Sequence, residues 1–237
     1  SQDLTALNLS GSLETLLNSS FNTKTKWPDS LPQEFNPQDV LEINKNPGLN
    51  LRSLHEQGIT GQGVSVAIID YALLVEHVEY KDKLKMYREI NFDESRAEFH
   101  GPSMASILVG ENAGVAPGAD LYYVAVRNMD LTKNDVIHNQ RYTAQAVRGL
   151  IKFNETLSKS EKIKVISISQ WWSPQTKGYK DVVKAVEEAK EAGIFVVSCN
   201  LWQYESSFHI HGLLKDTLAD PDDFASYYPA SWEHWLT

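Results

Sequence analysis

Two side chains in this sequence could together perform acid–base catalysis. Asp70 closes the apolar run Val64–Asp70, and a carboxylate there is costly to bury unless a donor hydrogen-bonds it. His100 precedes Gly101, Pro102 and a run of small residues, which predicts the first turn of a helix. A histidine that is held by a buried aspartate keeps one tautomer and can act as a general base. Taken singly, each residue is more typical of a cap or a turn, so the surroundings must decide.

The elements around this pair alternate between strands and helices from about residue 50 onward. Continuous apolar runs predict buried strands over 64–70, 121–126, 164–172 and 194–200. Apolar stripes at helical spacing lie between them, at Ala146, Val147, Leu150 and Ile151 and again at Val182, Val183, Val186 and Ala189. Gly193 would end the second helix. This order predicts an α/β fold, a three-layer and mostly parallel twisted sheet with helices on both faces. Ligands bind beyond the carboxyl ends of such strands, where Asp70 and Asn200 fall.

Residues 1–50 have a different composition from the rest of the chain. Four prolines interrupt any long helix here, and only Leu13, Leu16 and Leu17 after Ser12 indicate a short one. We interpret residues 1–50 as an extension that wraps over the main domain, 51–237, and a disordered tail over the first 20 residues is the alternative. The sequence does not decide between an inhibitory and a bracing role for this arm.

Composition excludes several classes of partner. The 237-residue chain has a net charge of −9 and no block of basic residues, which argues against nucleic-acid and membrane partners. No apolar run reaches the roughly 18 residues of a membrane span, and Ser1 opens no signal-peptide pattern. The single cysteine, Cys199, excludes an intrachain disulfide and leans towards the cytoplasm, although secretion stays open. The compartment is therefore unknown.

The order of several motifs resembles the subtilisin-like serine peptidases over about Leu51–Ala230. Gly61-Gln62-Gly63-Val64 through Asp70 is similar to the family's strand ending in the triad aspartate. His100 is similar to the triad histidine, and Gly114-Val115-Ala116-Pro117 to the turn that follows its helix. Further matches, in order, are the pocket strand Val165–Ser169, the oxyanion strand Gly193–Asn200 and the segment Tyr228-Pro229-Ala230.

The resemblance implies a serine endopeptidase that uses an Asp-His-Ser triad and no cofactor. Asp70 and His100 would be catalytic, Asn200 would donate to the oxyanion, and Ser169, Gln170 and Trp171 would bind a peptide substrate. The triad serine of the family comes after the oxyanion asparagine, so we expect it beyond Thr237, in a C-terminal segment of the same gene product. The alternative is a catalytically inactive pseudopeptidase or peptide-binding module on the same fold.

Three departures from the family pattern bear on this choice. Tyr71-Ala72 stands where Ser or Thr and then Gly is usual, and Gly-Pro-Ser follows the histidine instead of Gly-Thr-His. Ser169-Gln170-Trp171-Trp172 replaces Ser-x-Gly-Gly, which predicts an altered or partly filled pocket because two indoles would occupy the space of the glycines. Ser103 lies in a serine-like motif, but its context is that of the histidine helix, so we do not take it as the nucleophile.

Other chemical patterns are weaker. His209 and His211, near Asp216, Asp220, Asp222 and Asp223, could hold zinc, although surface histidines are the favoured interpretation. No metal is therefore expected, and the loop over 109–114 is too short for the family's calcium loop. Gly61-Gln62-Gly63 precedes its strand, whereas the glycines of a dinucleotide site follow theirs. The aromatic residues over 202–235 could line a peptide groove or fill a core.

Overall fold

The computed structural model describes residues 2–92, 96–132, 135–199 and 213–229. The chain forms two compact units. The sheet unit is Gln57–Ile210, and the terminal unit combines Ser1–Glu56 with His211–Thr237. Among the described residues, no helix has the length and apolarity needed to cross a lipid bilayer.

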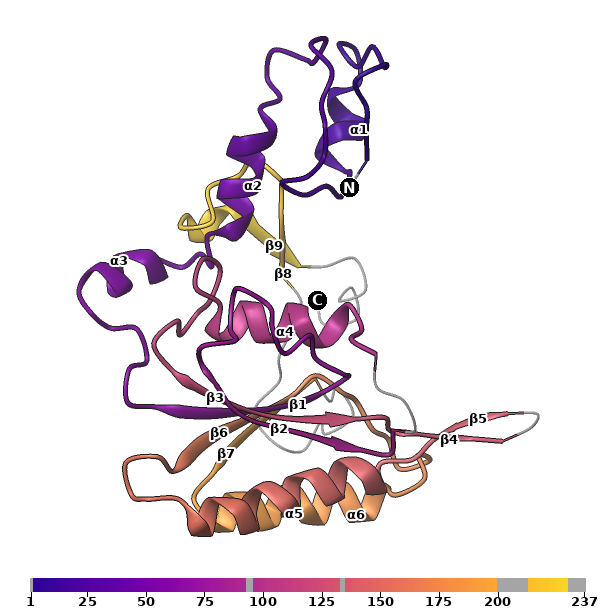
Figure 1. Ribbon diagram of the computed structural model, residues 1–237, viewed down its shortest axis with the longest axis vertical. Coiled ribbons are helices and arrows are strands. Elements are labelled where there is room, and N and C mark those ends of the chain that lie inside the picture. The colour runs from indigo at the N-terminus through magenta and orange to yellow at the C-terminus, as the bar shows by residue number, and fades with distance from the viewer. Residues whose placement is uncertain (1, 93–95, 133–134, 200–212, 230–237) are drawn as a thin grey trace. The chain divides into compact units, whose positions relative to one another are not determined.

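The sheet unit is built on five parallel strands in the order β2-β3-β1-β6-β7. These strands are β1 (Ser65–Asp70), β2 (Leu84–Ile90), β3 (Asp120–Val126), β6 (Ile163–Ile168) and β7 (Phe195–Ser198). Helix α4 (His100–Val109) covers one face, and α5 (Arg141–Thr156) and α6 (Tyr179–Glu191) cover the other (Figure 1). This confirms the predicted three-layer α/β fold with a parallel sheet.

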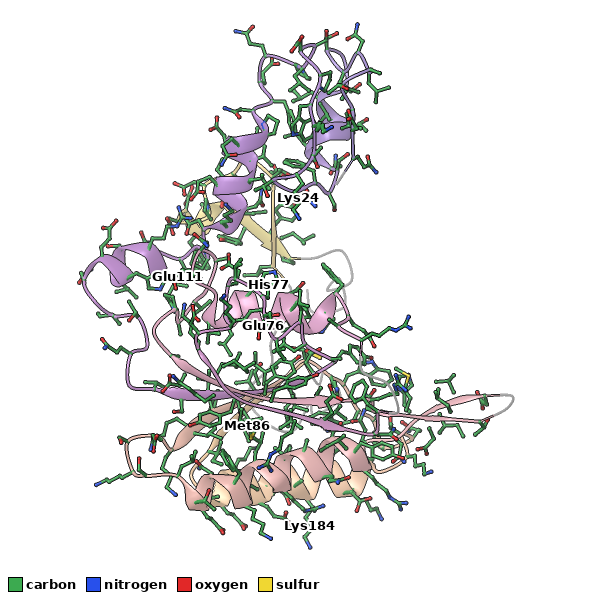
Figure 2. All side chains as sticks on the ribbon, viewed as in Figure 1. Lys24, Glu76, His77, Met86, Glu111 and Lys184 are labelled. Carbon is green, nitrogen blue, oxygen red and sulfur yellow. The ribbon has the colours of Figure 1, made fainter. Side chains whose placement is uncertain are left out.

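Alternation along the strands divides the core of the sheet unit into two layers. In β1 every residue is buried; Ala67 and Ile69 pack with α5 and α6, whereas Val66 and Ile68 pack on the side of α4. Met86 of β2 lies between the sheet and α5, and Lys184 of α6 points away from the sheet (Figure 2). The apolar stripes therefore predict the buried faces of both helices.

Strand ends differ from the sequence-based prediction at the sites that matter most. The strand expected over 164–172 ends at Ile168, so Ser169 and the residues after it lie outside the strand. The strand expected over 194–200 covers only Phe195–Ser198. Gly193 has a φ of 76° just after α6, as the predicted helix stop requires. The edge strand β2 and the hairpin of β4 (Met129–Leu131) and β5 (Val136–His138) were not predicted.

The terminal unit has a small core of its own. It contains α1 (Leu13–Leu17), α2 (Pro37–Lys45), α3 (Leu51–Glu56), the hairpin of β8 (Leu213–Lys215) and β9 (Tyr227–Pro229), and a short 3-10 helix at Phe224–Ser226. Phe21, Trp27 and Phe35 pack edge to face, with ring centroids 5.0–5.9 Å apart.

Asp222 links the two sequence segments of the terminal unit. Its carboxylate accepts hydrogen bonds from Asn46 Nδ2 at 2.9 Å and from the Asn50 amide at 2.7 Å. Residues 213–229 therefore pack with the N-terminal segment, although the sequence resemblance groups them with the peptidase domain.

Candidate active site

The site begins with Asp70, the last residue of the central strand β1. This strand lies between β3 and β6, and Asp70 pairs in register with Ala125 of β3. Its side chain is only 1% exposed. A carboxylate so placed sits at the carboxyl end of a parallel sheet, where this class of fold binds ligands.

The imidazole of His100 contacts this carboxylate directly. His100 is the first residue of α4, and its Nδ1 lies 2.7 Å from Asp70 Oδ1. With Nδ1 donating to the carboxylate, the neutral ring carries its lone pair on Nε2. Within the described part of the chain Nε2 has no hydrogen-bond partner, and the His100 side chain is 41% exposed. The ring is thus oriented on one side and accessible on the other, as a general base requires.

Gly101 allows the helix to approach the strand closely enough for this contact. A Cβ at this position would lie 2.6 Å from both the Tyr71 carbonyl oxygen and the Tyr123 hydroxyl. The two tyrosines are themselves joined, because the Tyr123 hydroxyl donates to the Tyr71 carbonyl at 2.7 Å. The glycine after the histidine is therefore needed for space.

Burial and hydrogen bonding shift the pKa of Asp70 in opposite directions. Burial raises the pKa of the Asp70 carboxyl above its ordinary value, and the contact with His100 and the Tyr71 amide hydrogen bond to Oδ1 (2.7 Å) oppose this rise. Ser169 is near enough to lower the Asp70 pKa slightly, yet Oδ2 has no hydrogen bond of good geometry from any described residue. The imidazole is thus the principal hydrogen-bond partner of this carboxyl group.

Residues 169–172 follow β6, and their side chains lie in different surroundings. Ser169, Gln170 and Trp171 line a cavity of about 90 Å³ together with Tyr71. Gln170 is buried and Trp171 is 54% exposed, whereas Trp172 is 1% exposed and packs in the core beneath the sheet. Only one of the two tryptophans that we expected to crowd the pocket therefore borders it.

For the other residues that the sequence singled out, the structure shows no contact with His100 or gives no description. The Ser103 hydroxyl donates to the Phe99 carbonyl at 2.9 Å, one turn back in its own helix region, and not to His100. Asn200, His209 and His211 lie outside the described residues.

The cavity also has polar lining residues that no motif singles out. Asn128 follows β3, and His138 and Gln140 lead into α5. The available signal in the sequence is the polar pair Asn139-Gln140 directly before an amphipathic helix, but such residues are ordinary at a helix start. Their place beside Asp70 and His100 depends on the tertiary fold.

Comparisons with known proteins find several solved structures that resemble this chain. Among solved structures, the chain is similar to the prenylagaramide maturation protease PagA, with 16% identity over 62% of this chain and 49% of that chain, and a TM-score of 0.45. The nisin leader peptidase NisP from Lactococcus lactis gives 16% identity, 66% and 50% coverage, and a TM-score of 0.47. A lanthipeptide protease gives 18% identity, 68% and 46% coverage, and a TM-score of 0.48.

The chain spans about half the length of these solved structures. A search of the curated proteins finds no match. The model of the subtilase family, peptidase family S8, matches residues 61–219, which include β1, α4 and all of the lined cavity. The chain therefore belongs to the subtilase family.

Proposed function

We propose that this protein is a serine endopeptidase that cleaves peptide bonds by acyl transfer. The observation that carries the proposal is the 2.7 Å contact between His100 Nδ1 and Asp70 Oδ1 at the end of the central strand. Membership of the subtilase family supports a serine-peptidase type of chemistry for that pair. The family order Asp, His, Ser matches the order of these two residues.

Each residue has a defined step in this proposal. His100 Nε2 takes the proton of the serine hydroxyl as that oxygen attacks the peptide carbonyl, and then gives the proton to the leaving amine. Asp70 holds the tautomer and stabilises the imidazolium. Water repeats the same sequence to release the acyl group. Asn200 would donate to the developing oxyanion, a contribution worth about 100- to 1,000-fold in kcat in subtilisin.

The proposal assigns the nucleophile to a segment outside residues 1–237. No described serine hydrogen-bonds His100, and the Ser103 hydroxyl is engaged with Phe99. We therefore propose a C-terminal segment of the same gene product as the partner that supplies the serine. Peptides are the proposed substrates.

A second candidate is a peptide-binding pseudopeptidase on the same fold. The observation that favours it is the replacement of the two pocket glycines of the family pattern by Trp171 and Trp172. Trp171 lines the cavity, which changes the surface where a substrate backbone would lie. This candidate shares the fold and the peptide ligand but lacks turnover.

Hydrolysis of a quenched fluorescent peptide library by the full-length protein separates the two candidates. The peptidase proposal predicts turnover that His100→Ala abolishes. Ser103→Ala is the matched control and keeps the wild-type rate. Turnover that survives His100→Ala, or a complete lack of turnover by the wild-type protein, would contradict the proposal.

A further inference from the structure

One buried tyrosine bonds the backbone directly after Asp70. Tyr123 lies in β3, beside β1, and is 0% exposed. Its hydroxyl donates to the carbonyl oxygen of Tyr71 at 2.7 Å. In the register of the two strands Tyr123 pairs with Ile68, so its side chain extends past the end of β1 to reach this carbonyl. The hydrogen bond therefore ties the segment that leaves β1 to the neighbouring strand.

Tyr71 connects this bond to the carboxylate of Asp70. The Tyr71 amide donates to Asp70 Oδ1 at 2.7 Å, and His100 Nδ1 contacts the same oxygen at 2.7 Å. Because the amide and the carbonyl belong to one residue, fixing the carbonyl also restricts the direction in which the amide points. The Tyr123 hydroxyl is thus linked to Asp70 Oδ1 through two hydrogen bonds of one short backbone segment.

The same hydroxyl lies against the start of α4. A Cβ on Gly101 would lie 2.6 Å from the Tyr123 hydroxyl and 2.6 Å from the Tyr71 carbonyl oxygen. The backbone next to His100 therefore packs on both atoms of this hydrogen bond. Loss of the hydroxyl would remove the partner of the Tyr71 carbonyl and leave a gap beneath the helix start.

The Tyr123 hydroxyl acts through position and not through proton transfer. Burial, and then the nearby Asp70, raise the pKa of Tyr123 well above its ordinary value of 10.0. The hydroxyl therefore stays protonated and donates to the Tyr71 carbonyl throughout the neutral range. Tyr123 is fully buried and is not among the residues that line the cavity, so it would not touch a bound peptide.

We infer that Tyr123 is a positioning residue for the contact between Asp70 and His100. Through Tyr71 it sets the direction of the Asp70 carboxylate, and beneath Gly101 it sets how closely α4 approaches. The inference rests on the proposed function for its effect on turnover. Its effect on the contact itself is independent of turnover and can be measured without it.

Tyr80 offers a matched control. Like Tyr123, it belongs to the core between the sheet and α4, and it is 1% exposed. Its hydroxyl also donates to a backbone carbonyl that follows β1, that of Leu74, at 3.0 Å. Leu74 is four residues from Asp70, whereas Tyr71 is adjacent to it. The two tyrosines therefore make the same kind of bond, but only Tyr123 bonds the residue whose amide holds the carboxylate.

Tyr123→Phe and Tyr80→Phe in the full-length protein test the inference. Each change removes one hydroxyl and keeps the ring, so both variants should fold and lose only a few degrees in melting temperature. With the best peptide, Tyr123→Phe should lower kcat about 10- to 100-fold and change KM by less than about twofold, because the base is displaced and the substrate surface is kept. Tyr80→Phe should keep kcat within about twofold of the wild-type value.

A spectroscopic measurement reports on the contact directly. A histidine Nδ1–H that donates to a carboxylate over a short distance has a proton resonance at low field in the NMR spectrum. In protein labelled with ¹⁵N-histidine, the resonance of His100 is assigned by its loss in His100→Ala. We expect it at the same position in the wild type and Tyr80→Phe. In Tyr123→Phe it should move to higher field or broaden through faster exchange with water.

Several results would overturn the inference. They are a resonance that is absent in the wild type or unchanged in Tyr123→Phe, equal changes in both variants, and failure of Tyr123→Phe to fold while Tyr80→Phe folds. The last result would assign the hydroxyl to the fold and not to the site.

The two measurements also separate this inference from the proposed function. If the wild-type protein hydrolyses nothing but the resonance changes only in Tyr123→Phe, the peptidase proposal fails and the positioning role stands. If hydrolysis depends on His100 and Tyr123→Phe keeps the full rate, the positioning role fails and the peptidase proposal stands.

Discussion

The two halves of the site are built on opposite principles. The acid–base half, at the end of β1 and the start of α4, consists of one short contact between Asp70 and His100 that Gly101 makes sterically possible. The proposed substrate half, between the end of β6 and the start of α5, contains buried amides and a hydroxyl. Trp171 and Trp172 stand where the family pattern has glycines. The comparison indicates that the first half depends on a single contact, whereas the second depends on a set of side chains joined by hydrogen bonds.

The largest expected effect is on the acid–base half. His100→Ala removes the proposed base, and the loss in kcat should be roughly 10⁶-fold, the size known for the corresponding change in subtilisin. Steady-state kinetics of the full-length protein on its best peptide measure this loss. A loss below about tenfold would mean that the two halves do not divide catalysis and recognition in this way.

Two adjacent tryptophans test the difference between a core position and a cavity position. Trp172→Ala should lower the free energy of unfolding by about 3–5 kcal/mol, because the ring is fully buried against α5 and α6. Trp171→Ala, at a position that is 54% exposed, should lower it by less than about 1 kcal/mol and change peptide binding instead. Urea unfolding measures both values. Equal effects on stability would contradict this division.

Gly101→Ala tests whether the close approach of α4 to the end of β1 sets the geometry of the base. The new Cβ would meet two oxygens at 2.6 Å, so the helix start has to move away from Asp70. A displacement of about 1 Å should cost on the order of 100-fold in kcat. Gly149→Ala in α5, where a Cβ meets nothing within 4 Å, is the control and should keep full activity. Full activity of Gly101→Ala would show that the site tolerates the shift.

The smallest expected effect is a pH dependence of stability that comes from Asp70. Because burial raises the pKa of Asp70 in the folded state, folding favours the protonated carboxyl. Its contribution to stability is complete below the ordinary value of 3.8 and is lost as the pH rises through the raised pKa.

Relative to Asp70→Asn, the wild-type protein should therefore lose stability as the pH rises from below 3.8 through the raised pKa of Asp70. Denaturant unfolding of both proteins at several pH values measures the difference. A wild-type protein that gains stability over this range, relative to the variant, would show that His100 outweighs burial.

The sequence predicts the contact between Asp70 and His100 well and the lining of the cavity poorly, for a physical reason. The all-buried strand β1 has a continuous apolar run that ends at Asp70, and the small residues after His100 fit a helix packed close to that strand. Local pattern and tertiary role agree there. The cavity instead brings Asn128, Gln140 and Gln170 together from three connections, and no local pattern encodes that meeting.

Irregular segments show the same limit of prediction. The edge strand β2 contains only half-buried and exposed residues and includes three charged side chains, so its sequence has no continuous apolar run. Asp222 joins the two sequence segments of the terminal unit through hydrogen bonds with Asn46 and Asn50. In the sequence, the stretch around Asp222 looks like an ordinary polar loop. The sequence suggested that Trp172 lies in the pocket, because it does not show that β6 ends at Ile168. With the strand ending there, the Trp172 side chain is buried in the core.

The central claim is that His100, held by Asp70, activates a serine. Labelling of the full-length protein with a fluorophosphonate, followed by peptide mass spectrometry to locate the modified residue, tests this claim most directly. We predict a single labelled serine outside residues 1–237, and loss of the label in His100→Ala but not in Ser103→Ala. A protein that takes no label, or that is labelled equally well without His100, would contradict the claim.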